Sequence, residues 1–304
     1  MSNALIAIDK TKSYRVYLTV STEMAQEAAK IHDTTPVTTA ALGRIVTGAG
    51  LMGIMMKNDT DKLTAIFKGD GPAKQILATA YGDGSVKASI ANPYVDLPLN
   101  EQGKLDVGGT LGIGELTVIK DIGLKEPYIG TIALVDGEIA DDLTAYFYIS
   151  EQQNTSVALG VKVERDLSVG AAGGMIIQLL PDAPEEIIDA LEKMIGNLDP
   201  MTTIISRVQE KSAGLSDRGF LEAVMADAFS AMPEEFKPET LEEREIKWNC
   251  DCSRERMASA LATIGHSDLQ EIIEEDGEAE LQCHFCLKKY KFNKEELTEI
   301  LNTI

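Results

Sequence analysis

Hydrophobic and polar positions alternate along much of the first 180 residues, and two longer stretches with helical spacing lie between them. Residues 14–20 (YRVYLTV) alternate and are rich in β-branched side chains, which predicts a strand, whereas apolar residues in 22–32 and 36–57 recur at helical intervals. Two alternating runs flank Gly82-Asp83-Gly84, a pattern typical of a β-hairpin. Further strands follow without a regular strand-helix-strand rhythm. The pattern favours an α+β fold, with residues 1–180 as the larger N-terminal domain.

The pattern changes after Pro181 to that of amphipathic helices. We expect one helix over 182–198, a second after Asp199-Pro200 and a third over 216–229. A segment with nine charges in the fourteen residues from Glu234 to Lys247 follows. Because it can bury few side chains, it is either a solvated linker or a part of the fold that opens at low free-energy cost. Residues 181–247 are therefore predicted to form a helical, charged connector.

Residues 248–304 have the sequence signals of a small, separate module. The candidate helix caps are Ser253, Ser267 with Gln270, and Asn293 with Glu296. Residues 279–292 indicate two short strands. The predicted core consists of Met257, Leu261, Ile264, Ile272, Leu281, Tyr290, Phe292, Leu297 and Ile300. A bound metal would supply the stability that so small a core lacks.

Composition and charge limit the classes of protein and partner. A chain of 304 residues with 44% hydrophobic residues can bury at least one sizeable core. The start of the chain lacks a basic region followed by an apolar stretch, and no window approaches eighteen uncharged apolar residues, so we expect a soluble cytoplasmic protein. A formal net charge of −21 repels phosphate backbones and anionic lipids. This charge argues against nucleic acid and membrane partners.

All four cysteines lie in two short motifs near the C-terminus, CDC with Cys250 and Cys252, and CHFC with Cys283 and Cys286. In a reducing compartment, clustered cysteines are metal ligands or redox groups more often than permanent disulfides. Two pairs separated by a helical excursion can bring four sulfurs to one tetrahedral point, and four thiolates select Zn²⁺. We therefore predict a four-cysteine zinc site. His284 lies inside CHFC, but four cysteines already complete the ligand set.

Two features of the motifs leave open whether this site is an inert staple or a redox switch. One residue separates Cys250 from Cys252, so a disulfide between them would close a tight and easily reduced ring. Ser253 begins a predicted helix, whose dipole favours thiolates at its N-terminus, and thiolates are the form that peroxide attacks. Oxidised sulfurs no longer bind zinc, so the module would lose the free energy that folds it.

Two other motifs match functional patterns, but structural roles explain them better. Gly48, Gly50 and Gly53 fit the dinucleotide-binding pattern G-x-G-x-x-G, yet they lie in a predicted helix, where small residues allow close packing. Asp141 and Asp142 could be acid/base carboxylates, but a turn into a helix explains them. No arrangement of serine, histidine and aspartate can be assembled. The sequence thus predicts no catalytic residues.

The cysteine motifs and the long N-terminal blocks resemble one family. CDCSRERM followed by CHFCLKKYKF is similar to the redox-regulated holdase chaperones of the 33-kilodalton heat-shock protein family. GIGELTVIKDIGLKEPYIGTIALVDGEIADDLTAYFYISEQ and VGAAGGMIIQLLP resemble that family's longest motifs. The resemblance covers nearly the whole chain. It departs at Gln153-Asn154, where a proline is expected nearby, and in the connector, which is too variable to match.

The resemblance implies a chaperone with a redox switch. The reduced protein would hold one Zn²⁺ on Cys250, Cys252, Cys283 and Cys286 and be inactive. Oxidants together with unfolding conditions would release the zinc and form the disulfides Cys250–Cys252 and Cys283–Cys286. The module and the connector would then unfold and expose apolar surface that binds unfolding client proteins without ATP, and the oxidised protein would form a homodimer. Such a protein is not an enzyme, and its charge of −21 would keep client complexes soluble.

Two other functions remain open at the level of the sequence. One is a structural zinc ribbon that recognises nucleic acid, but residues 248–304 carry six Lys or Arg against twelve Asp or Glu, the wrong sign for phosphate. The other is a thiol-disulfide oxidoreductase that acts through Cys283 and Cys286. Zinc that leaves only on oxidation, or lack of turnover with a disulfide substrate, would count against the oxidoreductase.

Overall fold

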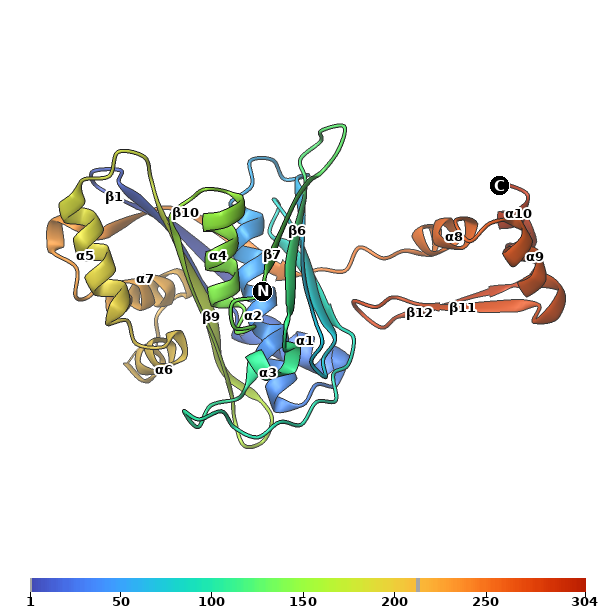
Figure 1. Cartoon of the computed structure of the whole chain (residues 1–304), viewed down its shortest axis with the longest axis horizontal. Helices are drawn as coiled ribbons and strands as arrows, with labels where there is room; N and C mark the ends of the chain where they lie inside the picture. Colours follow the sequence, from blue (N-terminus) through green and yellow to red (C-terminus); the bar gives the residue numbers. More distant parts are fainter. Residues whose placement is uncertain (1, 212–213) are drawn as a thin grey trace. The chain divides into compact units, whose positions relative to one another are not determined.

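Ten strands form one large sheet in the part of the chain that the structure, a computed structural model, describes: residues 2–211 and 214–304 (Figure 1). The strand order is β7-β6-β3-β4-β5-β10-β1-β2-β9-β8. Neighbouring strands are antiparallel except β10 and β5, which are parallel. The strands are β1 (Ser2–Asp9), β2 (Tyr14–Val20), β3 (Lys62–Gly69), β4 (Gln75–Tyr81), β5 (Ser85–Ile90), β6 (Gly114–Asp121), β7 (Tyr128–Ala133), β8 (Thr155–Val163), β9 (Val169–Leu179) and β10 (Pro238–Trp248). The α+β fold and the predicted hairpin around Gly82-Asp83-Gly84 are confirmed.

Helix α2 (Pro36–Ile54) lies between the two halves of the sheet (Figure 1). A Cβ atom on Gly50 would lie 2.8 Å from Cγ2 of Ile246, and one on Gly48 would lie 2.8 Å from Cδ1 of Leu143. The glycines therefore allow neighbouring side chains to pack closely against α2, as predicted. Among the described residues, α2 is the one helix that is long and apolar enough to cross a membrane, but 94% of its apolar window is buried, as in the core helix of a globular protein.

Shorter helices complete the inner layer, which is the larger hydrophobic core. They are α1 (Thr22–His32), α3 (Val107–Leu111) and α4 (Ala140–Ser150). Buried side chains of α4, among them Leu143, Tyr146 and Phe147, belong to the same core as those of α2. The helix packs against both β7 and β8, the two strands at the ends of the sheet order. The sheet therefore curls around α2, and α4 lies where its two edges approach each other.

The three predicted connector helices form a second layer on the opposite face of β1, β2 and β9 (Figure 1). They are α5 (Glu185–Gly196), α6 (Met201–Lys211) and α7 (Asp217–Ala228). On the sheet side this layer buries Leu5, Ala7, Tyr14, Val16, Leu18, Ala171, Met175 and Ile177. The helices contribute Ile187, Leu191, Met194, Met201, Ile204, Ile205, Val208, Leu221, Val224 and Met225. These helices are thus packed parts of the fold, and they cover an apolar sheet face.

The charged end of the connector is not a solvated linker, and that interpretation is wrong. After a short 3₁₀ turn (Glu234–Phe236), residues Pro238–Trp248 form β10. The strand pairs with β1 from Asp9↔Pro238 to Ser2↔Ile246, and with β5 only at Lys247↔Ser85 and Trp248↔Val86. This segment is a strand because its main chain pairs with strands that are distant in the sequence. Its many charges and few apolar residues do not indicate a strand.

Contacts divide the chain into two units, Met1–Trp248 and Asn249–Ile304. The second unit contains α8 (Arg254–Ala262), α9 (His266–Glu275), the hairpin of β11 (Glu278–Gln282) and β12 (Lys289–Asn293), and α10 (Lys294–Leu301). Its buried core is Leu261, Leu269, Ile273, Tyr290, Phe292 and Leu297. Ile264, which the sequence predicted inside, is 41% exposed. The predicted strands on either side of the second cysteine pair are confirmed.

Two of the three predicted caps in this unit are confirmed. The hydroxyl of Ser253 accepts a hydrogen bond from the N–H of Arg256 at 3.2 Å, and Asn293 and Glu296 form a capping box. The predicted cap at Ser267 is wrong, because α9 begins at His266 and its N-cap is Gly265, at a φ of 96°. A glycine adopts this conformation without strain, so the helix begins two residues earlier than the capping-box pattern indicated.

Candidate metal centre

The four cysteines lie on two loops of the second unit. Cys250 and Cys252 precede α8, whereas Cys283 and Cys286 lie in the turn between β11 and β12. The N–H of Cys283 donates to the carbonyl of Lys288 at 3.0 Å, and the N–H of Leu287 donates to the carbonyl of Cys283 at 2.8 Å. Leu287 adopts the left-handed conformation, with a φ of 57°. This tight turn brings the two sulfurs of CHFC to the same side of the hairpin tip.

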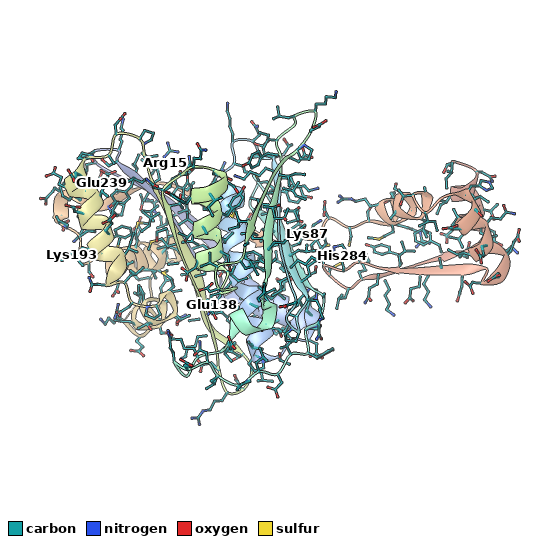
Figure 2. All side chains as sticks on the ribbon, in the orientation of Figure 1. Arg15, Lys87, Glu138, Lys193, Glu239 and His284 are labelled. Atoms are coloured by element: carbon teal, nitrogen blue, oxygen red, sulfur yellow. The ribbon has the colours of Figure 1, made fainter. Side chains whose placement is uncertain are left out.

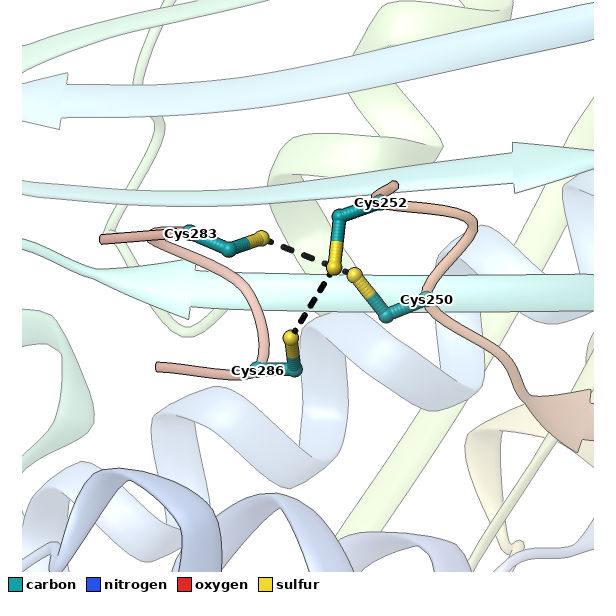
Figure 3. A group of neighbouring side chains, drawn as sticks. All are labelled: Cys250, Cys252, Cys283 and Cys286. Atoms are coloured by element: carbon teal, nitrogen blue, oxygen red, sulfur yellow. Dashed lines mark hydrogen bonds between the residues drawn. The ribbon is translucent and has the colours of Figure 1, made fainter. Parts of the chain in front are cut away.

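The sulfur atoms of both motifs come together in one cluster (Figure 3). All four Sγ atoms lie within 4.8 Å of one another. The Sγ atoms of Cys250 and Cys283 are 3.6 Å apart, and those of Cys252 and Cys286 are 3.3 Å apart. Four sulfurs bound at about 2.3 Å to one Zn²⁺ would lie roughly 3.8 Å apart. The free thiols therefore fit a tetrahedral metal ion, and the described part of the chain adds no histidine or carboxylate to this cluster.

Tyr290 is a neighbour of the cluster that the sequence assigned only to the core. Its hydroxyl lies 3.2 Å from Sγ of Cys252 and 3.2 Å from the carbonyl oxygen of the same residue. The hydrogen bond to Cys252, with burial, raises the pKa of Tyr290 to about 12. Burial opposes ionisation of Cys252, but hydrogen bonds from Tyr290 and from the other thiols outweigh it and lower the pKa of Cys252 to about 7.

The two thiols of CDC thus differ in the metal-free chain. Burial raises the pKa of Cys250 above its usual range, and burial also raises that of Cys286. The pKa is lowered at Cys252 alone, and among the causes that lower it the hydrogen bond with the hydroxyl of Tyr290 is the largest, so the effect of the helix start stays a prediction. Alternation along β12 indicates that Tyr290 is buried together with Phe292, but it gives no signal for the contact with Cys252.

Arg254 ties the first cysteine loop to the rest of the unit. Its guanidinium donates to the carbonyl of Lys291 at 2.6 Å and to Oε1 of Glu296 at 2.6 Å, and it lies 4.5 Å from the ring centre of Phe292. These contacts join the start of α8 to β12 and α10. The loop that holds Cys250 and Cys252 is therefore positioned by contacts to the same hairpin that holds the other two cysteines.

The two aspartates in the first turn of α4, Asp141 and Asp142, have a structural role. Oδ1 of Asp142 accepts from the N–H of Val135 at 2.7 Å, and its Oδ2 accepts from the N–H of Ile139 at 3.0 Å, so this buried side chain caps the helix. Burial raises the pKa of Asp142 and, with a hydrogen bond to Asp136, that of Asp141. Glu138, labelled in Figure 2, pairs with Arg44. These contacts support the predicted turn into a helix.

Comparison with known proteins agrees with the fold and the cysteine cluster. The family model described as "Hsp33 protein" matches residues 3–293. The 33 kDa chaperonin of Clostridium perfringens is 47% identical over 304 residues, covering 99% of this chain and 92% of the relative. That of Agathobacter rectalis is 46% identical over 286 residues, covering 94% of each chain.

A solved structure is similar across both units. The crystal structure of the 33 kDa chaperonin (heat shock protein 33 homolog) from Thermotoga maritima matches with a TM-score of 0.85 and 32% identity, covering 99% of this chain and 98% of that one. The family model and these relatives span almost the entire chain. The chain therefore belongs to the Hsp33 family of chaperones.

Proposed function

We propose that the protein is a redox-regulated, ATP-independent holdase whose switch is the four-cysteine cluster. The observation that carries this proposal is that all four cysteines of the chain converge in a unit with six buried apolar side chains. Cys250, Cys252, Cys283 and Cys286 would hold one Zn²⁺. When bound, the metal holds the four thiolates together and supplies folding free energy that so small a core lacks.

The sulfur chemistry of the switch needs only an oxidant such as hydrogen peroxide. Two thiols and one peroxide give one disulfide and two molecules of water, so two peroxides oxidise both pairs and accept four electrons. We propose the pairs Cys250–Cys252 and Cys283–Cys286, in which each disulfide joins neighbours on one loop. Sulfur atoms in disulfides no longer bind zinc, so oxidation removes the link between the two loops.

Loss of that link would propagate into the first unit through a short connection. Only Asn249 separates Trp248, the last residue of β10, from Cys250. Unfolding of the module would free β10 and the preceding helices α5–α7. The apolar sheet face beneath these helices, lined by Leu5, Val16 and Leu18 among others, would then be available to unfolding clients.

This proposal includes the other properties expected of such a chaperone. The oxidised protein would form a homodimer, it would act in the cytoplasm under oxidative stress, and it would have neither catalytic turnover nor nucleic acid or membrane partners. The net charge of −21 supports a role in keeping client complexes soluble.

One time course tests the proposal in the full-length, zinc-loaded protein. Zinc release, thiol loss and aggregation of a thermally unfolding client are followed together, with peroxide at elevated temperature and a reduced control. We expect zinc release, two disulfides and suppression of aggregation in the oxidised sample only. Equal suppression of aggregation in both samples, or zinc that stays bound, would show that the cluster is a structural zinc site and not a redox switch.

A double variant separates the switch from a thiol-disulfide oxidoreductase. Cys283→Ser with Cys286→Ser removes half of the ligands, so the module should lose zinc and suppress aggregation without oxidant. An oxidoreductase acting through this pair would instead lose its turnover of a disulfide substrate. Ser267 offers a matched control, because Ser267→Ala changes an exposed residue of the same unit that caps no helix and leaves all four thiols in place.

A further inference from the structure

Strand β10 carries charged residues where its neighbour β1 is apolar. The register places Glu243 opposite Leu5, Glu242 opposite Ile6 and Glu239 opposite Ile8 (Glu239 is labelled in Figure 2). Cross-strand neighbours stabilise a sheet when their side chains pack against each other, as apolar and β-branched pairs do. A carboxylate opposite an aliphatic side chain makes no such contact. The side chains of β10 are therefore poorly matched to the strand that it pairs with.

Few side chains hold β10 in place. Of its eleven residues, all of which the structure describes, only Ile246 is fully buried, and Leu241 is 62% exposed. Two side-chain contacts join it to the β1 side of the sheet, an ion pair between Lys10 and Glu239 at 3.4 Å and a hydrogen bond from Asn3 to Glu243 at 2.8 Å, and both are exposed and hence weak. Main-chain hydrogen bonds and Ile246 thus provide most of the attachment.

Strand β1, which pairs with β10 in the sheet, is apolar and could pair with another strand. Its sequence SNALIAID has one charged residue, Asp9, at its end. Over residues 238–246, β10 has β1 as its only strand partner among the described residues, because β5 joins β10 only at Lys247 and Trp248. Removal of β10 would therefore leave one edge of β1 unpaired along its length, while β2 stays paired with the other edge. An apolar, unpaired strand edge is a template for another strand.

We propose that β1 is a concealed strand-addition site, that β10 occupies it in the resting protein, and that an extended apolar segment of an unfolded client pairs with it once β10 has left. This inference rests on the proposed function and names the client-binding mode. The main chain of the client would take the place of β10, and its side chains would pack where Glu239, Glu242 and Glu243 now lie. Strand addition gives affinity through main-chain hydrogen bonds and so tolerates many client sequences.

The cross-strand register favours a client over a second copy of this chain. If a second copy offered its own β10, glutamates would again lie opposite Leu5, Ile6 and Ile8. Two copies with a net charge of −21 each also repel one another. An apolar or β-branched client segment has neither disadvantage, so it is the better occupant of this edge.

Two peptides test whether the site recognises a strand. The first is a fluorescent decapeptide of alternating valine and threonine with lysine at each end, and the second has two central residues replaced by proline, which cannot pair in a strand. We expect the full-length oxidised protein to bind the first peptide about tenfold more tightly than the second, because two hydrogen-bonding positions are lost. Hydrogen exchange should show that the first peptide protects residues 2–9. Equal binding of the two peptides would overturn the inference.

A variant of β10 tests competition for the same edge. Glu239→Thr with Glu242→Thr improves the cross-strand match to Ile8 and Ile6 and keeps the hydrogen bond between Asn3 and Glu243, so β10 should return to β1 more often and weaken peptide binding about threefold. The matched control is Glu234→Thr with Glu235→Thr, which removes two charges from the 3₁₀ turn outside the strand and should change nothing. Zinc release and exchange of α5–α7 should be the same in both variants. Unchanged peptide affinity in the β10 variant would exclude the β1 edge as the site.

The outcome also separates this inference from the proposed function. If the oxidised parent suppresses client aggregation but does not distinguish the peptides, clients bind the sheet face alone, and strand addition is wrong while the redox holdase stands. If the oxidised parent releases zinc and neither suppresses aggregation nor binds either peptide, both proposals fail.

Discussion

Asn293 is a single side chain on which the stability of the second unit, Asn249–Ile304, depends. Its Oδ1 accepts from the N–H of Glu296 at 3.0 Å, and Glu296 in turn accepts from the N–H of Asn293 at 2.9 Å. Asn293→Ala should cost about 1 kcal/mol, because it leaves donors of the first turn of α10 without a partner. We expect the variant to release zinc at a lower peroxide concentration, measured with a chromogenic chelator. Asn302→Ala, at an exposed position after the same helix, is the control and should behave like the parent.

Asp141 gives the first unit a pH dependence of a defined sign. Burial and the hydrogen bond to Asp136 raise its pKa, so the folded chain takes up a proton here at a higher pH than the unfolded chain does. Stability from this residue therefore grows as the pH falls from about 7 toward its ordinary pKa. Asp141→Asn should raise the melting temperature at neutral pH and reduce the gain between about pH 7 and about pH 5. Equal pH profiles for this variant and for Asp96→Asn, an exposed aspartate, would contradict the assignment.

At the scale of single residues, the sequence predicts contacts between residues that are close together along the chain. The caps at Ser253 and Asn293 depend on residues three positions away, and both are confirmed. The four ligand candidates could be found because no cysteine lies elsewhere in the chain. Tyr290 beside Cys252 could not be found in the same way, since 38 residues separate the two and only the fold of the hairpin brings them together.

Among the elements, β10 is the one whose attachment depends most on one side chain. Ile246 is fully buried against Gly50 of α2, so Ile246→Ala should weaken the strand by about 2 kcal/mol or more. In the reduced, zinc-loaded protein we expect faster amide exchange in residues 238–248 and client binding at a lower temperature. Leu241→Ala lies on the same strand at a mostly exposed position and should change stability by less than about 0.5 kcal/mol. Equal exchange in the two variants would show that Ile246 does not anchor β10.

The sequence predicts a helix or strand when the hydrophobic pattern of that element shows which of its faces is buried. Helices α5–α7 have apolar stripes and lie where the pattern places them. The charged segment before the cysteines has no such stripe, because β10 is held by main-chain pairing with a strand at the opposite end of the chain. A pattern of side chains does not record main-chain pairing, so the strand could not be predicted.

For the whole molecule, charge should control the proposed association of oxidised copies. Each copy has a net charge of −21, so two copies repel one another until salt screens the repulsion. Sedimentation of the oxidised protein should therefore show tighter dimers at about 500 mM than at about 50 mM salt. The reduced, zinc-loaded protein is the control and should stay monomeric at both concentrations. Dimers that weaken with salt would indicate that ion pairs between copies hold them together.

The strand order shows the limit of prediction at this scale. The first strand, β1, pairs with β10 at the end of the first unit, and β3 pairs with β6 as well as with its neighbour in sequence, β4. Nothing in the spacing of apolar residues selects these partners, whereas the α+β class follows from the mixture of elements itself. The class was therefore predictable, and the order of strands was not.

The pairing of β1 with β10 also has a consequence during translation. Asn3 and Glu243, joined by a hydrogen bond between these strands, are separated by 240 residues. At a synthesis rate of roughly 5–20 residues per second, β1 leaves the ribosome roughly 10 to 50 s before its partner. Throughout that interval every nascent chain presents the unpaired, apolar edge of β1 to its neighbours on the same polysome. The protein must therefore pass, once in each molecule's life, through an exposed state of the same edge that the finished fold conceals.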